Sequence, residues 1–307
     1  MRILPTLRQL KYLVAVAEHR HFGRAAEECL VTQSTLSAGL RELEDLLGVT
    51  LVSRGRRQAT LTMIGEEVVE RARTLLRAAD ELVDAAQAGG KPLTGLLRLG
   101  VIPTVAPYLL PRALPALRRA YPELRLYLRE EQTARLVELL ARRRLDGAVI
   151  ALPYATGGLE AMVMGEDALL VACPEQHPFA CRPGITGSEL KGERLLLLED
   201  GHCLRNHALT ACGLQPGQAN EDMQATSLGT LLQMVAGGLG LTLVPRLAVA
   251  VETRREPGLA VVPFSDDKPP QRRIALVWRP DSVRSADLRL LGEALSRHLS
   301  EIGAAGG

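Results

Sequence analysis

Residues 32–48 read TQSTLSAGLRELEDLLG, and this stretch decides the fold of the first part of the chain. Its leucines recur every three or four positions, which is the spacing of one apolar helix face. They are Leu36, Leu40, Leu43 and Leu47. Thr32 is a residue type that caps helix N-termini, and Gly48 is a type that ends helices. The stretch therefore predicts a helix over residues 33–47 with one buried face.

Two shorter helical patterns precede this helix, at about residues 7–17 and 22–30, with a turn at Val31. Short helices joined by a tight turn form a helix-turn-helix, whose second helix reads base edges in the major groove. Polar side chains at the start of that helix suit such contacts. They are Thr32, Gln33, Ser34, Thr35 and Ser37. We expect this module to bind double-stranded DNA; a plain three-helix bundle with a solvated polar face is the alternative.

Strand-like residues 50–52 and 60–62 bracket the loop SRGRRQ at residues 53–58. A two-stranded wing with a basic tip has this pattern. Arginine suits phosphate and minor-groove contacts. We therefore expect Arg54, Arg56 and Arg57 to contact DNA, and a solvated turn is the alternative.

Residues 66–88 contain neither Pro nor Gly, and their apolar residues alternate spacings of four and three. This is the pattern of a coiled-coil seam. The seam consists of Val68, Ala72, Leu75, Ala79, Leu82 and Ala86. We interpret the segment as a dimerisation helix that ends at the hinge GGKP, residues 89–92; one more core helix is the alternative.

From residue 95 onward, strand and helix patterns alternate. Strands are expected at 96–102, 124–130, 148–152, 168–173, 195–198, 223–226, 241–244, 259–264 and 273–279, and helices at 106–120, 133–144, from 203, at 227–236 and at about 283–299. Such alternation predicts a mostly parallel sheet with helices on both faces. Two units of this kind joined by crossing strands resemble a periplasmic-type binding protein, which binds ligands in a cleft at the carboxyl ends of its strands.

We therefore predict an α/β chain with three parts. An all-α winged helix-turn-helix domain takes residues 1–62, and a linker helix takes 63–90. A two-lobed regulatory domain like a periplasmic binding protein takes 91–307, with lobe I at about 91–165 plus 268–307 and lobe II at about 166–267.

The 307 residues carry a formal net charge of only +2, so DNA binding must rest on local features. Residues 1–20 lack the apolar core of a signal peptide, and no stretch reaches the roughly 20 apolar residues of a membrane helix. We expect a cytoplasmic protein with no membrane partner. Its five cysteines would be kept reduced there, so a disulfide would be transient and would carry information.

A second stretch, LLLLEDGHCLRNHALTACG at residues 195–213, joins a buried-strand pattern to a short helical pattern with a cysteine at each end. Cys203 lies at the expected helix N-terminus beside His202 and Arg205. Its thiolate would therefore have the helix dipole and two cationic neighbours. We interpret the segment as a redox switch with Cys203 and Cys212 as its thiols; a buried, inert Cys203 is the alternative.

The spacing of these cysteines has a geometric consequence. In a continuous helix, the Cα atoms of Cys203 and Cys212 lie roughly 13.5 Å apart. A disulfide requires roughly 4.4–6.8 Å. Oxidation must therefore unwind or refold the segment, and we expect the reduced and oxidised forms to differ most between about residues 200 and 222.

Several segments resemble a known family. VAVAE at 14–18, FGRAA at 22–26 and TQSTLS at 32–37 are similar to the winged helix-turn-helix of LysR-type transcription regulators, and residues 95–300 resemble their effector domain. More narrowly, the chain resembles the peroxide-sensing OxyR group of that family. The segments that carry this likeness are AEHRHF at 17–22, IPTVAPYLLP at 102–111, LEDGHCLR at 198–205 and ATSL at 225–228.

The resemblance implies roles for particular residues. Cys203 would be the peroxidatic cysteine and Cys212 the resolving one, with Thr104 and Thr133 binding hydrogen peroxide. Helix or turn capping is the alternative for each threonine. The family further implies a homodimer or homotetramer, contact with RNA polymerase, and re-reduction by a thiol reductant of the glutaredoxin or thioredoxin type. It implies no cofactor and no metal.

The chain also departs from the family pattern. Asn206 and His207 stand where acidic and amide residues are expected after Arg205, which puts the peroxide sensitivity in doubt. The arginines of the wing and the sequence TMIG at 62–65 put the DNA sequence preference in doubt.

Three other functions compete with this interpretation. A two-cysteine thiol peroxidase would share the chemistry but has no use for residues 1–88, so we expect no enzyme. A LysR-type regulator could sense a small metabolite while its cysteines are incidental. A metal sensor could use His202, Cys203, His207 and Cys212, although a helix would hold these residues too far apart for a compact site.

Overall fold

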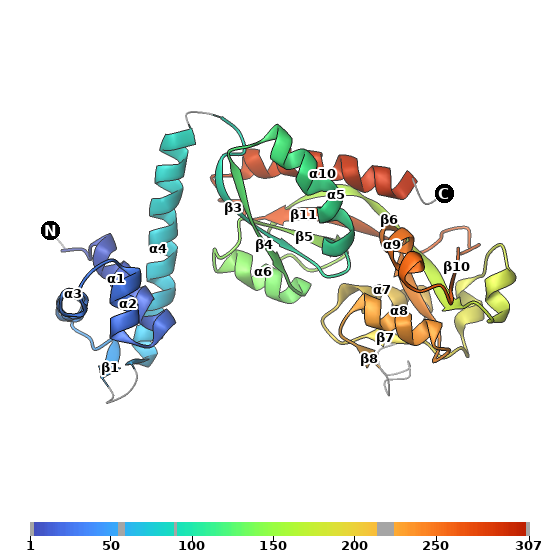
Figure 1. The fold of residues 1–307 in the computed structure, drawn as a ribbon, viewed down its shortest axis with the longest axis horizontal. Coiled ribbons are helices and arrows are strands. Elements are labelled where there is room, and N and C mark those ends of the chain that lie inside the picture. The colour runs from blue at the N-terminus through green and yellow to red at the C-terminus, as the bar shows by residue number, and fades with distance from the viewer. Residues whose placement is uncertain (1–2, 55–58, 89–90, 214–223, 305–307) are drawn as a thin grey trace. The chain divides into compact units, whose positions relative to one another are not determined.

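The chain divides between Gly90 and Lys91 into two units (Figure 1). The computed structural model describes residues 3–54, 59–88, 91–213 and 224–304. The predicted wing-tip residues Arg56 and Arg57 lie outside these ranges, as does the first residue of the strand expected at 223–226. Within the described ranges, no helix has the length and apolar character that crossing a bilayer requires.

The first unit contains the predicted helix-turn-helix, a two-stranded wing and a long helix (Figure 1). Its elements are α1 (Leu7–His19), α2 (Phe22–Glu28), α3 (Gln33–Leu47), β1 (Val52–Arg54), β2 (Ala59–Leu61) and α4 (Met63–Ala88). The Thr35 amide donates to Thr32 Oγ1 at 3.2 Å, and Gly48 ends α3 with a φ of 69°. The predicted helix over residues 33–47 and both of its caps are therefore confirmed.

Gly65 joins the wing tightly to α4. Thr62 Oγ1 donates to the Thr50 carbonyl at 2.8 Å and accepts from the Gly65 amide at 3.0 Å. A Cβ atom on Gly65 would lie 2.1 Å from the carbonyl oxygen of Leu51, so only glycine permits this approach. Because α1 also packs along α4, the first part of α4 belongs structurally to the winged module.

The predicted seam on α4 is divided between two environments. Ala72 is buried in the unit's own core, whereas Leu75 and Leu82 are 54% and 72% exposed. Val83, which the predicted seam did not include, is exposed as well. The side chain of Ala86 lies outside the described part of the chain. The apolar surface that a partner could cover therefore begins at Leu75.

The second unit is built on a seven-stranded sheet in the order β10-β6-β11-β5-β3-β4, with β9 paired to β6. The strands of this sheet are β3 (Gly95–Val101), β4 (Leu124–Glu130), β5 (Gly147–Leu152), β6 (Glu160–Pro174), β9 (Thr242–Pro245), β10 (Leu259–Val262) and β11 (Gln271–Trp278). The helices are α5 (Ala106–Ala120), α6 (Thr133–Ala141), α7 (Cys203–Ala211), α8 (Leu228–Ala236), α9 (Arg246–Arg255) and α10 (Ser285–Ala304). Two short strands, β7 (Leu197–Leu198) and β8 (Gln224–Ala225), pair in parallel beside α7 and α8.

The prediction of a mostly parallel sheet is wrong. Only the β3–β4 and β3–β5 pairings of the large sheet are parallel, while β6 and β11 pair with their described neighbours in antiparallel fashion. The strand expected at 168–173 is one end of the 15-residue β6. An apolar run reveals that a strand is buried but not the direction of its neighbour, because that pairing is decided by segments distant in sequence.

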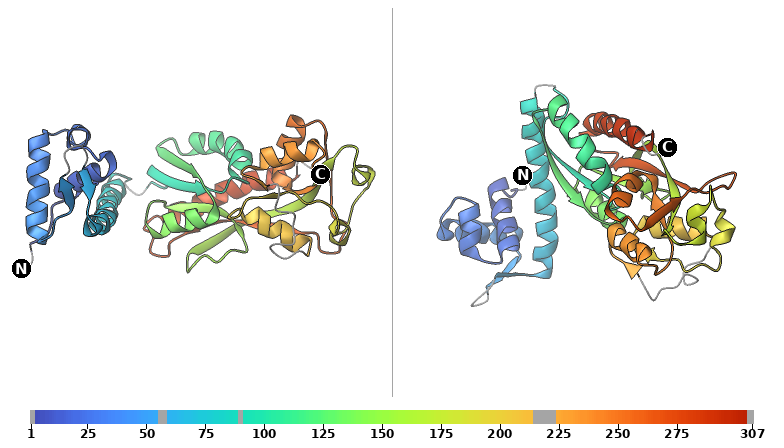
Figure 2. Two further views of the ribbon diagram at one scale, coloured as in Figure 1. Left: turned by 90° about the horizontal axis from the view of Figure 1, so that it is seen from below. Right: turned by 45° about the vertical axis from the view of Figure 1, so that its right-hand side comes forward.

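Helices cover both faces of the first part of this sheet (Figures 1 and 2). α5 and α10 pack against each other on one face, and α6 lies on the other. A Cβ atom on Gly100 would lie 2.4 Å from the Leu136 side chain of α6, so a glycine in β3 lets α6 approach closely. This packing places the N-terminus of α6 near the carboxyl end of β3.

Candidate functional site

The two predicted redox cysteines lie at the two ends of α7. Cys203 is the first residue of the helix, His202 precedes it as the N-cap, and Cys212 is the C-cap. The Cys212 amide donates to the Ala208 carbonyl at 3.1 Å, so helical hydrogen bonding continues to this cysteine. Both thiols are free and buried. The helical separation assumed for the switch is therefore present.

Arg205 holds the segment before α7 in place. Its side chain is buried, its Nε atom lies 2.9 Å from Asp200 Oδ1, and its Nη1 atom donates to the Leu198 carbonyl at 3.4 Å. Residues two apart on a helix do not share a face, so Arg205 and Cys203 point in different directions. We infer that Arg205 positions the loop that carries Cys203.

The sequence suggested that His202 is a cationic neighbour of Cys203, but its environment favours the neutral imidazole. Burial lowers the pKa of its imidazole, and the nearby Glu199 carboxylate opposes this effect only in part. His202 is therefore mostly neutral near pH 7. Burial also raises the pKa of the Cys212 thiol to about 11, so Cys212 stays protonated until it becomes exposed to solvent.

Thr104 lies in a buried network just after β3. Arg272 Nη1 donates to Thr104 Oγ1 at 2.7 Å, and Arg272 Nη2 donates to the Thr104 carbonyl at 3.0 Å. Arg272 also forms an ion pair with Asp167 at 2.9 Å, and Asp167 Oδ1 accepts from the Leu247 amide at 3.1 Å. A hydroxyl has one hydrogen to donate. Because Arg272 occupies an acceptor position of Thr104, that hydrogen remains available for a ligand.

Thr133 is the first residue of α6 and is 1% exposed. Gln132 is the N-cap, so the capping alternative for Thr133 is wrong. Thr133 Oγ1 is buried and has no hydrogen-bond partner among the described residues. Gln132 Nε2 donates to the Asp200 carbonyl at 3.4 Å, and a Cβ atom on Gly201 would lie 2.3 Å from Gln132 Oε1. These contacts bring the start of α6 against the loop that leads into Cys203.

His207 was predicted only as a ligand in the metal-sensor alternative and not as part of the peroxide site. Its pKa is lowered to about 4, first by burial and then by the positive charge of Arg272, while the backbone of Leu152 acts in the opposite direction. The Arg272 that binds Thr104 is therefore also close enough to act on His207. The spacing of four residues from Cys203 is the sequence signal that could have identified it.

The metal-sensor alternative gains no support from this region. In the described ranges, no group of three or more His, Cys, Asp or Glu side chains lies together as metal ligands would.

Most of the residues predicted to bind DNA lie at the N-terminus of α3. Gln33 and Ser34 are exposed at the start of α3. Thr32 caps the helix, and its hydroxyl also lies within 2.9 Å of the Ser34 hydroxyl and 2.8 Å of the Thr35 hydroxyl. The N-terminus of α3 is thus polar and held in one arrangement. The remaining predicted contacts in the described range are Ser37, which is half-buried on α3, and Arg54, which ends β1.

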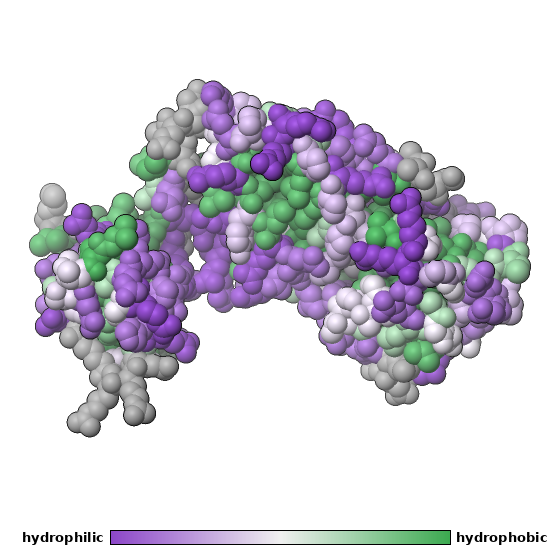
Figure 3. All heavy atoms as spheres, in the orientation of Figure 1, coloured by the Kyte–Doolittle hydropathy of each residue, from purple (hydrophilic) through white to green (hydrophobic). Residues whose placement is uncertain are grey.

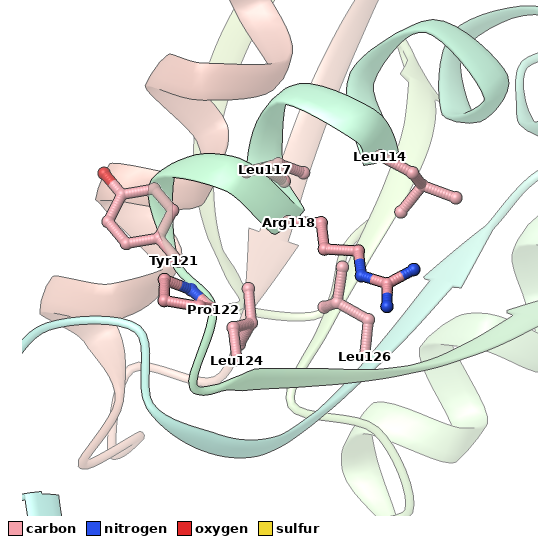
Figure 4. A pocket seen from close by; sticks show the side chains of 7 residues that line it. All are labelled: Leu114, Leu117, Arg118, Tyr121, Pro122, Leu124 and Leu126. Carbon is pink, nitrogen blue, oxygen red and sulfur yellow. The ribbon is translucent and has the colours of Figure 1, made fainter.

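An apolar pocket of about 220 Å³ lies between α5 and β4 (Figure 4). It is lined by Leu114, Leu117, Arg118, Tyr121, Pro122, Leu124 and Leu126. The face seen in Figure 3 also shows hydrophobic residues gathered beneath α5, between hydrophilic margins. None of the lining residues belongs to the elements around Cys203, so this pocket is separate from the thiol chemistry.

Comparison with known proteins identifies the class. Residues 7–66 match the model described as bacterial regulatory helix-turn-helix protein, lysR family, and residues 90–300 match the LysR substrate binding domain. The chain is 43% identical to a hydrogen peroxide-inducible genes activator of Dickeya chrysanthemi, over 95% of each chain.

Two solved structures are similar over nearly the whole length. Full-length OxyR from Pseudomonas aeruginosa, a cysteine-to-aspartate variant, superimposes with a TM-score of 0.75 at 35% identity and covers 95% of this chain and 98% of its own. A cysteine-to-serine variant of OxyR from Corynebacterium glutamicum with hydrogen peroxide bound has a TM-score of 0.70 at 37% identity, with 100% and 96% covered.

These matches show that the chain belongs to the LysR family of bacterial helix-turn-helix regulators. Within that family it groups with the OxyR proteins, the hydrogen peroxide-inducible activators. The predicted combination of a winged module and an effector domain is confirmed.

Proposed function

We propose that this protein is a cytoplasmic, DNA-binding transcription regulator that senses hydrogen peroxide through Cys203 and stores the signal as a Cys203–Cys212 disulfide. The observation that carries the proposal is the position of the two free cysteines at opposite ends of α7. Beside them, α6 presents a buried Thr133 hydroxyl that has no partner among the described residues, next to the loop that leads into Cys203. The names of the similar proteins support it.

Thr104 and Thr133 would bind the peroxide. The Thr104 hydroxyl, oriented by Arg272, can donate to a peroxide oxygen, and the unpaired Thr133 hydroxyl can donate or accept. Cys203 is only 8% exposed, so a bulky oxidant has little access to its sulfur. Small size is therefore part of the selection for peroxide.

The reaction conserves atoms and electrons. The Cys203 thiolate attacks one peroxide oxygen, an S–O bond forms and the O–O bond breaks. The departing hydroxide takes the proton that the thiol lost and leaves as water. The Cys212 thiol then attacks the sulfenic sulfur, an S–S bond forms, and a second water leaves. A thiol reductant of the glutaredoxin or thioredoxin type would return both cysteines to the reduced state.

The DNA contacts would come from the polar start of α3 and from the wing. Gln33 and Ser34 are exposed there, supported by Thr32, Thr35 and Ser37. Arg54, Arg56 and Arg57 would contact phosphates or the minor groove. A change in the packing of homodimers or homotetramers would alter these contacts and the recruitment of RNA polymerase at antioxidant genes.

Replacing Leu82 by Arg is expected to separate the paired winged modules. Leu82 is 72% exposed in the single chain and would be buried in a dimer seam. An arginine at this position would bury its charge away from water, which opposes dimer formation. Loss of two-site binding should weaken DNA affinity by about 10²-fold. Sedimentation and titration of a two-half-site duplex measure both effects. Asp80→Arg, on another face of α4, is the control, and unchanged affinity of Leu82→Arg would contradict the seam.

The proposed function is tested by adding one equivalent of hydrogen peroxide to the reduced protein. Mass spectrometry should find a Cys203–Cys212 disulfide, and the DNA footprint should change at the same time. Cys203→Ser should show neither. A footprint that ignores peroxide but responds to a small metabolite would favour the metabolite sensor. Steady turnover of many peroxide equivalents with a thioredoxin would favour the peroxidase.

A further inference from the structure

Buried polar atoms without a partner identify a second residue beside Cys203. Such an atom loses its hydrogen bonds to water on folding, so its presence in a folded protein requires an explanation. Among the described residues, Thr133 Oγ1 and His207 Nδ1 are both of this kind. Thr133 is already a proposed peroxide contact, and His207 likewise has a buried polar atom with no partner among the described residues.

His207 shares one face of α7 with Cys203. The two residues are four positions apart in a continuous helix, which places their Cβ atoms about 5–6 Å from each other. From the other side, the imidazole lies close to the Leu152 backbone at the end of β5 and within the field of Arg272 on β11. Because Arg272 also binds Thr104, the positive charge that acts on His207 lies beside Thr104.

The charge state of His207 decides whether its imidazole can accept a hydrogen bond. Burial and the Arg272 charge hold its pKa at about 4, so the ring is neutral at neutral pH and keeps one nitrogen lone pair. Arg272 is a hydrogen-bond donor, and the Thr104 hydroxyl that it binds is left to donate. Hydrogen peroxide carries two O–H groups and Thr133 Oγ1 offers one acceptor for them, so a second acceptor is needed for the other O–H.

We propose that the neutral imidazole of His207 is a positioning residue that accepts a hydrogen bond from a peroxide O–H and thereby directs a peroxide oxygen toward the Cys203 sulfur. This inference rests on the proposed function, because it concerns the same peroxide and the same thiol. It also explains why the buried His207 Nδ1 atom has no partner among the residues that the structure describes, because the ligand supplies the partner.

The inference is tested in the full-length chain with Cys212→Ser, so that oxidation stops at the sulfenic acid. His207→Leu should slow the formation of sulfenic acid by hydrogen peroxide about tenfold, the effect of one hydrogen bond. The rate of Cys203 alkylation by iodoacetamide, which needs no acceptor, should not change. His207→Gln keeps an acceptor oxygen and should retain most of the peroxide rate, and Thr133→Val serves as the reference for losing one peroxide contact.

A stability measurement completes the test. Since His207 Nδ1 has no hydrogen-bond partner in the described part of the chain, His207→Leu should be at least as resistant to urea as the parent while being slower with peroxide. The inference is overturned if His207→Leu reacts with peroxide as fast as the parent, or if its peroxide and iodoacetamide rates fall together. If the parent itself forms no sulfenic acid at Cys203, the proposed function fails and this inference with it.

Discussion

One equivalent of hydrogen peroxide is expected to abolish the amide hydrogen-exchange protection of α7, residues Cys203–Ala211, while the amides of α3 keep theirs. The helix holds the two Cα atoms roughly 13.5 Å apart, whereas a disulfide permits roughly 4.4–6.8 Å. The bond therefore cannot form while α7 persists. Exchange measured by mass spectrometry before and after oxidation tests this. Cys212→Ser is the matched control, because its Cys203 can be oxidised but has no thiol to bond.

The rate of disulfide formation depends on the cost of exposing buried side chains of α7. Unwinding α7 exposes the buried side chains of Leu204, Ala208 and Leu209, each of which stabilises the reduced form. Cys212 is 1% exposed with a raised pKa, so it becomes a nucleophile only after the helix end opens. Disulfide formation should therefore be slower than sulfenic acid formation. A disulfide that forms with α7 protection intact would show that the helix is not the moving element.

Asp167→Ala is expected to lower the free energy of unfolding of the regulatory unit by about 3–5 kcal/mol, because it leaves the Arg272 charge buried without its counter-ion. Both side chains are essentially inaccessible to solvent, and Asp167 also accepts from the Leu247 amide. Urea unfolding followed by circular dichroism measures the loss. Glu160→Ala breaks an ion pair with Arg289 that lies at the surface, and it should cost less than about 1 kcal/mol.

A double replacement separates charge from packing at this site. Asp167→Leu with Arg272→Met removes both charges, and such exchanges are often neutral for stability. The double variant should nevertheless react slowly with peroxide, because Thr104 loses the donor that orients its hydroxyl. An Asp167→Ala variant as stable as the parent would show that Arg272 finds another partner and does not depend on this ion pair.

Local structure followed closely from local sequence. The bounds of α3 and its caps, the limits 106–120 of α5 and the start of α7 at Cys203 were all predicted correctly. Local signals were enough, because apolar spacing acts within one or two turns of helix and, in α3, a side-chain cap acts within the first turn. Long-range pairing did not follow. The antiparallel placement of β6 and β11 depends on contacts between segments about a hundred residues apart.

At the site, too, local features were predicted from the sequence and long-range contacts were not. Cys203 and its helix were visible as a motif, but Arg272 was not, because it lies 168 positions from the Thr104 that it binds. His207 was noticed only as a departure from the family pattern and as a ligand in the metal-sensor alternative. Its burial and its unpaired Nδ1 depend on β5 and β11, which the local sequence of α7 does not describe.

The close approach of Gly65 to Leu51 couples movements of α4 to the winged module that carries α3. Since the wing and α4 are locked together there, a rotation of one end of the helix turns the other end with it. A helix of 26 residues is about 39 Å long at 1.5 Å per residue. A tilt of about 5° at its far end therefore shifts the winged module by about 3.4 Å, which is the spacing of successive base pairs. In the proposed dimer, a small rearrangement between subunits is thus enough to move α3 by one step along the groove.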